Sequence, residues 1–137
     1  RRGYLQVLDS GKIRLFKSYN PSYADGDQER DFLYVKDAVE MTLFFLDHST
    51  ISGIFNAGTG VTRTWNDLSE AVFKAMDREV AVEYIDMPVS IRDQFQYRTC
   101  AKINKIRNAG YSKPITSLEV AITDYIQNYL YSNKRLS

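Results

Sequence analysis

The chain has 137 residues, a formal net charge of +1 and a hydrophobic fraction of 44%, values typical of one soluble globular domain spanning residues 1–137. The near balance of basic and acidic residues argues against a nucleic-acid-binding surface, and no stretch approaches the ~20 apolar residues of a membrane span. One cysteine and one histidine exclude an internal disulfide, argue against a zinc site and fit a reducing compartment.

The first predicted elements are a helix and a short strand. Residues 1–8 resemble the end of a helix with Gly11 as its C-terminal stop. Because this opening lacks Met and begins inside a helix, we interpret the sequence as a piece of a longer protein. Residues 13–16 alternate as a strand, and the polar stretch 17–28 (KSYNPSYADGDQ) predicts a loop. Its length exceeds the usual ~4–6 residues, and long loops in compact domains are often functional.

The stretch RDFLYVKD (residues 30–37) predicts a strand followed by a helix start. Apolar and aromatic residues alternate over 30–35, as in a strand. Asp37 stands where a helix N-cap belongs, with Glu40 completing a capping box for a helix that reaches residue 47. Arg30 would then lie at the mouth of a supported strand, where a guanidinium can bind phosphate or carboxylate. An ordinary surface arginine is the alternative that this local pattern leaves open.

A glycine-containing turn is predicted in the middle of the chain. Residues 52–57 (SGIFNA) indicate a short buried strand that runs into Gly58-Thr59-Gly60, and Thr64 caps a helix with an apolar face over residues 68–76. Glycines between a strand and a helix can expose backbone N–H groups to a phosphate. The third glycine and the acidic residue of a dinucleotide-binding motif are absent, so this segment favours a tight turn rather than a cofactor loop.

The last third of the chain predicts one strand and two helices. Residues 80–85 form the strand, and a short helix is expected between Thr99 and Gly110. Thr116 and Glu119 predict a second capping box for the final helix, beyond which residues 132–137 should fray. The alternation of strands and helices indicates an α/β fold whose strands pair in parallel.

No catalytic constellation stands out in the sequence. The patterns Gly-x-Ser-x-Gly, His-Glu-x-x-His and Tyr-x-x-x-Lys are all absent. Loop aromatics such as Phe16 and Phe95 suit either stacking on a nucleobase or core packing. Arg92 could supply a second cation near an anion or form a local ion pair with Asp93. The residues therefore indicate a site for an anionic ligand with an aromatic part, without catalytic residues.

Two segments carry a resemblance to a known family. RDFLYVKD (30–37) and SGIFNAGTG (52–60) resemble the C-terminal part of extended short-chain dehydrogenases/reductases that act on nucleotide sugars. Three further segments resemble one family more specifically, that of the ADP-L-glycero-D-manno-heptose 6-epimerases, and the resemblance extends over residues 11–131. They lie at LFKS (15–18) with Asn20-Pro21, at VEYIDMP (82–88), and at FQY (95–97) with IRNAGY (106–111).

The resemblance implies the C-terminal, substrate-binding portion of an extended Rossmann-type enzyme, without the N-terminal Rossmann core. The intact enzyme would be a cytoplasmic, NADP-dependent homo-oligomer that interconverts ADP-D-glycero- and ADP-L-glycero-D-manno-heptose for lipopolysaccharide core synthesis. The family's NADP-binding segment and its Tyr/Lys pair belong upstream of Arg1, so we expect neither catalytic nor cofactor-binding residues here, and no activity from this chain alone. The alternatives are another nucleotide-sugar epimerase or dehydratase, and a stand-alone nucleotide-sugar-binding module.

The resemblance also assigns substrate-binding positions, one by one. Arg30 matches the family's substrate-binding arginine, for which the diphosphate is the natural partner. Phe95 stands where the family usually has a substrate-contacting tyrosine, so a hydroxyl is missing there. Arg98 likewise replaces an aromatic residue. The predicted substrate-binding residues are Phe16, Lys17, Ser18, Tyr19, Arg30 and Phe95.

Overall fold

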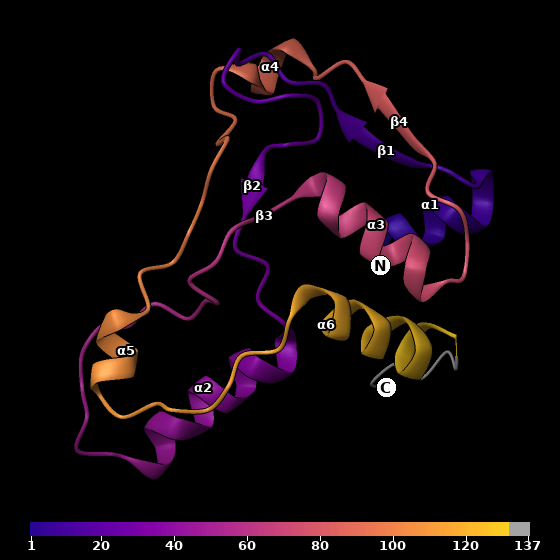
Figure 1. Ribbon diagram of the computed structural model, residues 1–137. Helices are drawn as coiled ribbons and strands as arrows, with labels where there is room; N and C mark the ends of the chain where they lie inside the picture. Colours follow the sequence, from indigo (N-terminus) through magenta and orange to yellow (C-terminus); the bar gives the residue numbers. More distant parts are fainter. Residues whose placement is uncertain (132–137) are drawn as a thin grey trace.

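The computed structural model describes residues 1–131 of the chain, and its elements form two groups (Figure 1). At one end lies a two-stranded parallel sheet with α1, α3, α4 and α6, and at the other end lie α2 and α5. The elements are α1 (Arg2–Ser10), β1 (Ile13–Phe16), β2 (Glu29–Arg30), α2 (Val35–Asp47), β3 (Arg63–Thr64), α3 (Trp65–Ala75), β4 (Val82–Ile85), α4 (Val89–Arg92), α5 (Asn104–Asn108), α6 (Leu118–Tyr125) and a π-helical turn, η1 (Ile126–Leu130).

The first group is built around the parallel pair β1 and β4, in register from Ile13 opposite Val82 to Phe16 opposite Ile85. This pairing confirms the expected α/β arrangement with parallel strands, whereas the short strands β2 and β3 pair antiparallel, contrary to the prediction. α1 ends at Gly11, whose φ of 70° is the left-handed conformation that glycine adopts readily. The core joins α1, β1, α3 and η1 through Val7, Ile13, Val72, Phe73, Ala75, Met76 and Ile126.

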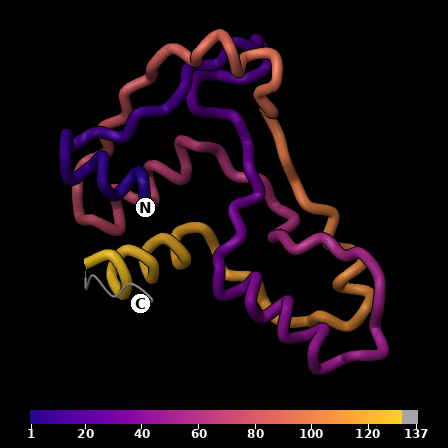
Figure 2. The backbone as a smooth tube through the Cα atoms, turned by 180° about the vertical axis from the view of Figure 1, so that it is seen from behind, coloured from indigo at the N-terminus to yellow at the C-terminus, as the bar shows by residue number. Residues whose placement is uncertain are grey.

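The second group packs α2 against α5 and two extended segments. Its core contains Met41, Ile106 and Tyr111, with partly buried aromatic residues around them. Figure 2 shows the segment that precedes β3 running beside the segment that leads into α5. The two segments are tied where the Asn56 side-chain amide donates to the Lys102 carbonyl at 3.3 Å. Two separate small cores therefore stabilise the chain.

Two predicted strands are wrong in extent. The strand expected over 30–35 is limited to Glu29–Arg30, since β3 offers only two residues for pairing and α2 already begins at Val35. No strand forms over 52–57, where Ile54 is 88% exposed. A β-strand requires a neighbour to pair its backbone groups, and no other described segment pairs with 52–57. The pattern of side chains alone therefore overestimated the extent of both strands.

Two predicted capping boxes are also wrong. α2 begins after Tyr34, and the buried Asp37 instead accepts hydrogen bonds from Thr116, at 2.8 Å from both its backbone nitrogen and its hydroxyl. Ser117 caps α6. Both predicted capping residues thus bond to each other and join α2 to the start of α6. In contrast, Thr64 caps α3 as predicted, with Asp67 completing a capping box.

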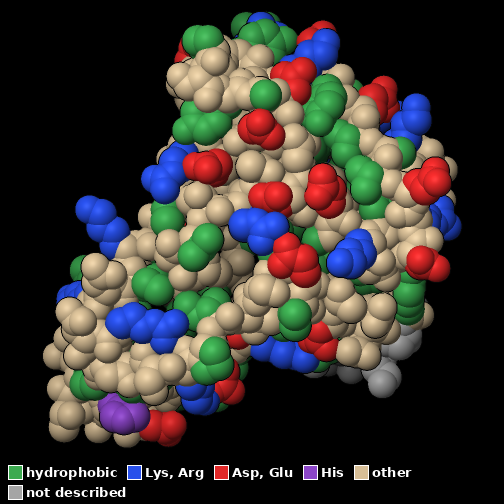
Figure 3. Space-filling model, viewed as in Figure 1, with side chains coloured by type: hydrophobic (Ala, Val, Ile, Leu, Met, Phe, Trp, Pro, Cys, Tyr) green, Lys and Arg blue, Asp and Glu red, His purple; other side chains and the backbone are tan. Residues whose placement is uncertain are grey.

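The remaining boundaries differ modestly from the predictions. α5 begins at Asn104 rather than after Thr99, because the preceding residues are irregular and Ala101 contributes its backbone N–H to a tertiary contact described below. β4 begins at Val82, two residues later than expected. The frayed tail predicted for 132–137 lies outside the described residues. Figure 3 shows acidic and basic side chains interspersed over the viewed face, and among residues 1–131 no helix is long and apolar enough to cross a membrane.

The carboxylate of Asp124 on α6 links that helix to the start of α2. It accepts hydrogen bonds from the Tyr34 hydroxyl and, at 2.7 Å, from the Lys36 ammonium. The bond to Lys36, together with those to Tyr34 and Asn128, lowers the pKa of Asp124 to about 2. Burial and the carboxylate raise the pKa of the Tyr34 hydroxyl to about 12. The link is therefore fully formed at neutral pH.

Acidification should weaken this link in a defined window. Because folding lowers the pKa of Asp124, its stabilisation is present above the ordinary value of ~3.9 and is lost as the pH falls toward about 2. We expect the unfolding free energy of the wild type to fall more steeply between pH 4 and pH 2 than that of Asp124→Asn. Urea titrations of both proteins across that range measure the difference, and parallel pH profiles would contradict the link's contribution.

Candidate functional site

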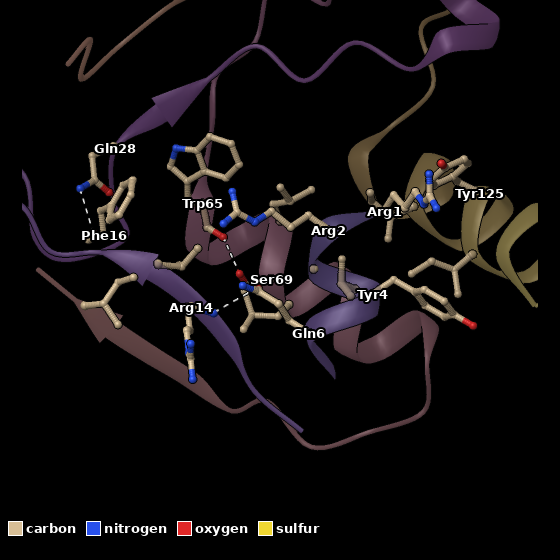
Figure 4. Close-up of a pocket in the computed structure, with 18 of the residues that line it drawn as sticks. Arg1, Arg2, Tyr4, Gln6, Arg14, Phe16, Gln28, Trp65, Ser69 and Tyr125 are labelled. Carbon is tan, nitrogen blue, oxygen red and sulfur yellow. Dashed lines mark hydrogen bonds between the residues drawn. The ribbon is translucent and has the colours of Figure 1, made fainter. Parts of the chain in front are cut away.

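A cavity of about 430 Å³ lies beside the parallel sheet, lined mostly by apolar side chains from α1, α3, β1 and α6. Two of the predicted substrate-binding residues, Phe16 and Phe95, line it. Figure 4 shows Gln28, Phe16 and Trp65 toward one end of the cavity, and Arg1 and Tyr125 toward the other. A mostly apolar cavity with a few polar groups is the usual form of a small-molecule site.

Two residues that the sequence did not single out define one end of this cavity. Gln28 is only 1% exposed, and its amide donates to the Phe16 carbonyl at 3.2 Å. The Trp65 backbone nitrogen donates to the Gln28 carbonyl, and its ring meets Phe32 edge-to-face at 5.1 Å. Gln28 thereby ties the end of the long loop to the end of β1. A buried glutamine has no local sequence signature, since tertiary packing alone decides its burial.

Arg30 lies against the ring of Phe95. Its guanidinium carbon is 5.3 Å from the ring centroid, and one of its nitrogens donates to the Glu29 carbonyl at 2.7 Å. Partial burial lowers the pKa of the guanidinium. No carboxylate within residues 1–131 forms an ion pair with Arg30. Its charge is thus compensated only by a carbonyl and an aromatic face.

The arginine directly opposite Arg30 has a different environment. Arg63 pairs with Arg30 across the β2–β3 ladder. Its guanidinium contacts Asp67 at 3.0 Å and Glu119 at 2.7 Å, bonds that raise the pKa of Arg63. The two neighbouring arginines therefore differ in their ion pairs. Arg63 joins β3 to α3 and α6, whereas Arg30 keeps its charge available to a ligand.

Lys17 and Tyr19 lie at the carboxyl ends of the parallel strands. The Lys17 ammonium is 3.1 Å from Asp86, and the Tyr19 hydroxyl donates to the same carboxylate at 3.2 Å. The Arg92 guanidinium stacks over the Tyr19 ring at 3.7 Å and donates to its hydroxyl at 2.9 Å. The Arg92 side chain also donates to the Met87 carbonyl at 2.8 Å. Of the two readings left open for Arg92, these contacts favour a positioned cation over an ion pair with its sequence neighbour.

Aromatic side chains connect this cluster to Arg30. Phe95 meets Tyr97 edge-to-face at 5.3 Å, and Tyr97 packs against Tyr23 at 5.4 Å. The Tyr97 hydroxyl accepts a hydrogen bond from the Tyr19 backbone nitrogen at 3.0 Å. We call Phe95, Tyr97 and Tyr19 the aromatic row, because ring contacts and the hydrogen bond from Tyr19 to Tyr97 connect them from Arg30 to Arg92. Residues distant in sequence are thus assembled as a mixed cationic and aromatic surface, which suits phosphates and a flat ring.

Ser18 and Arg98 are occupied within the protein. The Ser18 hydroxyl donates to the Asn20 carbonyl at 2.9 Å, and its backbone nitrogen donates to Asp25 at 2.7 Å, so Ser18 shapes the long loop. Its role toward a ligand stays a prediction. Arg98 pairs with Glu29 at 2.8 Å and bridges to it through the backbone. This pairing gives a physical reason for an arginine at position 98.

The Gly58–Gly60 turn binds a carboxylate of the chain itself. Asp31 accepts hydrogen bonds from the Thr59 nitrogen at 2.8 Å, the Thr59 hydroxyl at 2.7 Å, and the Gly60 and Ala101 nitrogens at 3.0 Å. Burial raises the pKa of Asp31, but these bonds outweigh it and lower the pKa overall. A Cβ on Gly58 would lie 2.3 Å from the Ala101 side chain. Because Asp31 occupies its N–H groups, this turn does not fit a cofactor phosphate.

The sequence matches a known family over its first part. Residues 4–58 match the model of the NAD dependent epimerase/dehydratase family. The chain is 50% identical over 129 residues to an ADP-L-glycero-D-manno-heptose-6-epimerase of Nitratidesulfovibrio vulgaris (strain DP4), covering 94% of this chain and 40% of that protein. It is 45% identical over 133 residues to the enzyme of that name from Fusobacterium nucleatum, covering 93% of this chain and 40% of the relative. The chain therefore spans less than half the length of these relatives.

Solved structures share the fold at a similar coverage. A UDP-N-acetylglucosamine 4-epimerase from Methanobrevibacter ruminantium superimposes with a TM-score of 0.75 at 18% identity, over 95% of this chain and 38% of that structure. The ADP-L-glycero-D-manno-heptose-6-epimerase of Helicobacter pylori superimposes with a TM-score of 0.72 at 25% identity, over 93% of this chain and 36% of that structure. The α/β fold is thus that of a part of an extended epimerase.

Proposed function

We propose that this chain is part of an NAD-dependent epimerase/dehydratase and that it binds the nucleotide sugar in an NADP-dependent epimerase. The proposed reaction of the intact protein interconverts ADP-D-glycero- and ADP-L-glycero-D-manno-heptose, a step that supplies lipopolysaccharide core synthesis. The name shared by the two relatives at 45% and 50% identity supports the choice of sugar nucleotide.

The observation that carries the proposal is the environment of Arg30. This guanidinium is partly desolvated and lies on the Phe95 ring, yet it has no carboxylate partner within residues 1–131. An arginine so placed retains full attraction for an anion, and its planar fork matches two phosphate oxygens. We assign the diphosphate of the nucleotide sugar to Arg30.

The other predicted substrate-binding residues surround the proposed contact between Arg30 and the diphosphate. Phe16 and Phe95 offer apolar surface in the cavity beside Arg30. Lys17 and Tyr19 lie at the far end of the aromatic row, where they place further donors near the carboxyl ends of the strands. In this arrangement the chain binds and orients its ligand by charge and stacking, and it excludes water from the sugar by the apolar walls of the cavity.

The chemistry of hydride transfer belongs to a nicotinamide cofactor when one is bound. The residues described here do not fit its phosphates at Gly58–Gly60, where Asp31 occupies the backbone donors. We therefore place NADP, together with the acid/base pair, in the remainder of the longer protein. In consequence, we propose that this chain by itself is inactive.

Selectivity among nucleotide diphosphates tests the proposal. We expect the intact protein to bind ADP-sugars more tightly than UDP-, GDP- or dTDP-sugars in calorimetric titrations, and to epimerise ADP-heptose. A clear preference for another base would instead identify a different nucleotide-sugar epimerase or dehydratase. Tight binding without turnover by the intact protein would indicate a stand-alone binding module.

A further inference from the structure

A compact polar cluster lies outside the cavity, at the carboxyl ends of β1 and β4. Lys17 directly follows β1 and Asp86 directly follows β4, and the parallel pairing places both strand ends at the same edge. In open α/β sheets, ligands bind outside the carboxyl ends of the strands. The cluster therefore occupies a position where a ligand is expected, and it connects to Arg30 through the aromatic row.

The cluster holds more positive than negative charge. Lys17 and Tyr19 both donate to the single carboxylate of Asp86, at 3.1 Å and 3.2 Å. Arg92 donates to the Tyr19 hydroxyl at 2.9 Å and to the Met87 carbonyl at 2.8 Å, both of them neutral acceptors. Among the hydrogen-bonded side chains of the cluster, one carboxylate thus faces two cations, while Asp25, which also attracts Lys17, is bonded to the Ser18 nitrogen. Such an arrangement favours an anion that carries more charge than Asp86.

Tyr19 and Arg92 are held by contacts other than Asp86, whereas the Asp86 carboxylate is exposed to solvent. The Tyr19 backbone is held by the Tyr97 hydroxyl, and the stacked Arg92 is held by the carbonyl of the fully buried Met87. The Asp86 side chain, in contrast, is 71% exposed. Rotation about its Cα–Cβ bond moves the carboxylate into water and leaves Tyr19 and Arg92 in place, while the Lys17 ammonium is released to pair with another anion.

From this geometry we propose that Asp86 occupies an anion subsite formed by Lys17, Tyr19 and Arg92, and that a phosphate group of the nucleotide sugar displaces it. This inference rests on the proposed function and deepens it, since it adds Arg92 to the ligand-binding residues and makes Asp86 a competitor of the ligand. Asp86 then holds Lys17 in position in the absence of ligand and weakens binding by its own charge.

Removal of the Asp86 charge should strengthen ADP binding, which a purely supporting residue would not do. In the intact protein, Asp86→Asn should bind ADP about two- to fivefold more tightly than the wild type, the range expected for one exposed ion pair. Arg92→Gln should weaken ADP binding by at least a similar factor. Glu83→Gln is the matched control, because Glu83 lies on β4 shortly before Asp86 and also forms an exposed ion pair, with Arg14 at 3.2 Å. This substitution should leave the Kd for ADP unchanged. Isothermal titration calorimetry at constant ionic strength measures all four proteins.

The outcomes separate this inference from the proposed function. If the wild type binds ADP and Asp86→Asn binds it equally or less tightly, Asp86 is a supporting residue and the inference is wrong. If the wild type binds no ADP or ADP-sugar, the proposed function fails, and titration with pyrophosphate then decides on the subsite. Tighter binding of pyrophosphate by Asp86→Asn supports the subsite, and equal or weaker binding overturns it.

Discussion

Replacement of Arg30 by alanine should weaken ADP-sugar binding by about 2–5 kcal/mol, the range for the loss of one partner of a desolvated charge pair. The expected loss is large because Arg30 is partly buried on Phe95 and has no carboxylate of its own within residues 1–131. The Kd of an ADP-sugar, measured by calorimetry on the intact protein, gives the effect directly. Arg30→Lys should recover only part of the affinity, since an ammonium cannot bind two phosphate oxygens in the fork of a guanidinium.

Arg78→Ala is the matched control for this substitution. Arg78 is exposed beyond the end of α3, and the one hydrogen bond described for its side chain is a long one, 3.4 Å, to the Val7 carbonyl. Its loss removes the same charge far from the aromatic row, so the Kd should be unchanged. If Arg30→Ala bound the ADP-sugar as tightly as Arg78→Ala does, Arg30 would be an ordinary surface residue and the central assignment would be incorrect.

Replacement of Asp31 by alanine should lower the unfolding free energy by about 2–4 kcal/mol, because several donors lose their shared acceptor at once. The backbone nitrogens of Thr59, Gly60 and Ala101 all bond to this carboxylate, and so does the Thr59 hydroxyl. These bonds join the end of β2 to two segments distant in sequence. Urea denaturation followed by circular dichroism measures the effect, which should exceed that of any single exposed charge.

Two further variants make the Asp31 result specific. Asp31→Asn keeps one carbonyl oxygen and should lose an intermediate amount of stability. Asp93→Ala removes an exposed carboxylate and should change the unfolding free energy by less than about 0.5 kcal/mol. Equal stabilities of Asp31→Ala and Asp93→Ala would show that the turn supports itself without the carboxylate.

The structure brings several of the predicted substrate-binding residues together, and their role toward a ligand stays a prediction. Phe16 and Phe95, far apart in sequence, line the same cavity, and Arg30 contacts Phe95. Lys17 and Tyr19 form a neighbouring cluster. The resemblance to a family supplied these positions, because residues with a common ligand share no local pattern. Gln28, Trp65 and Asp86 were missed, since their burial or pairing arises only when the long loop meets α3 and the strand ends.

The sequence by itself determined those features that depend on residues a few positions apart. Thr64 and Asp67 cap α3, and Gly11 ends α1, because each acts within a single turn of helix. The apolar periodicity of residues 68–76 likewise predicted both α3 and its buried face. The α/β class followed from the order of such elements, and the parallel pairing of β1 with β4 agrees with it.

Tertiary structure decided the features in which local groups have a choice of partner. Asp37 and Thr116 each have a sequence suited to capping, yet they bond to each other across 79 residues. Residues 52–57 have a strand-like sequence but lack a pairing partner among residues 1–131, so they remain irregular. The same principle explains why Arg30 and Arg63, although both are arginines on paired strands, have different environments. Carboxylates from α3 and α6 neutralise Arg63, whereas Arg30 keeps its charge for a ligand.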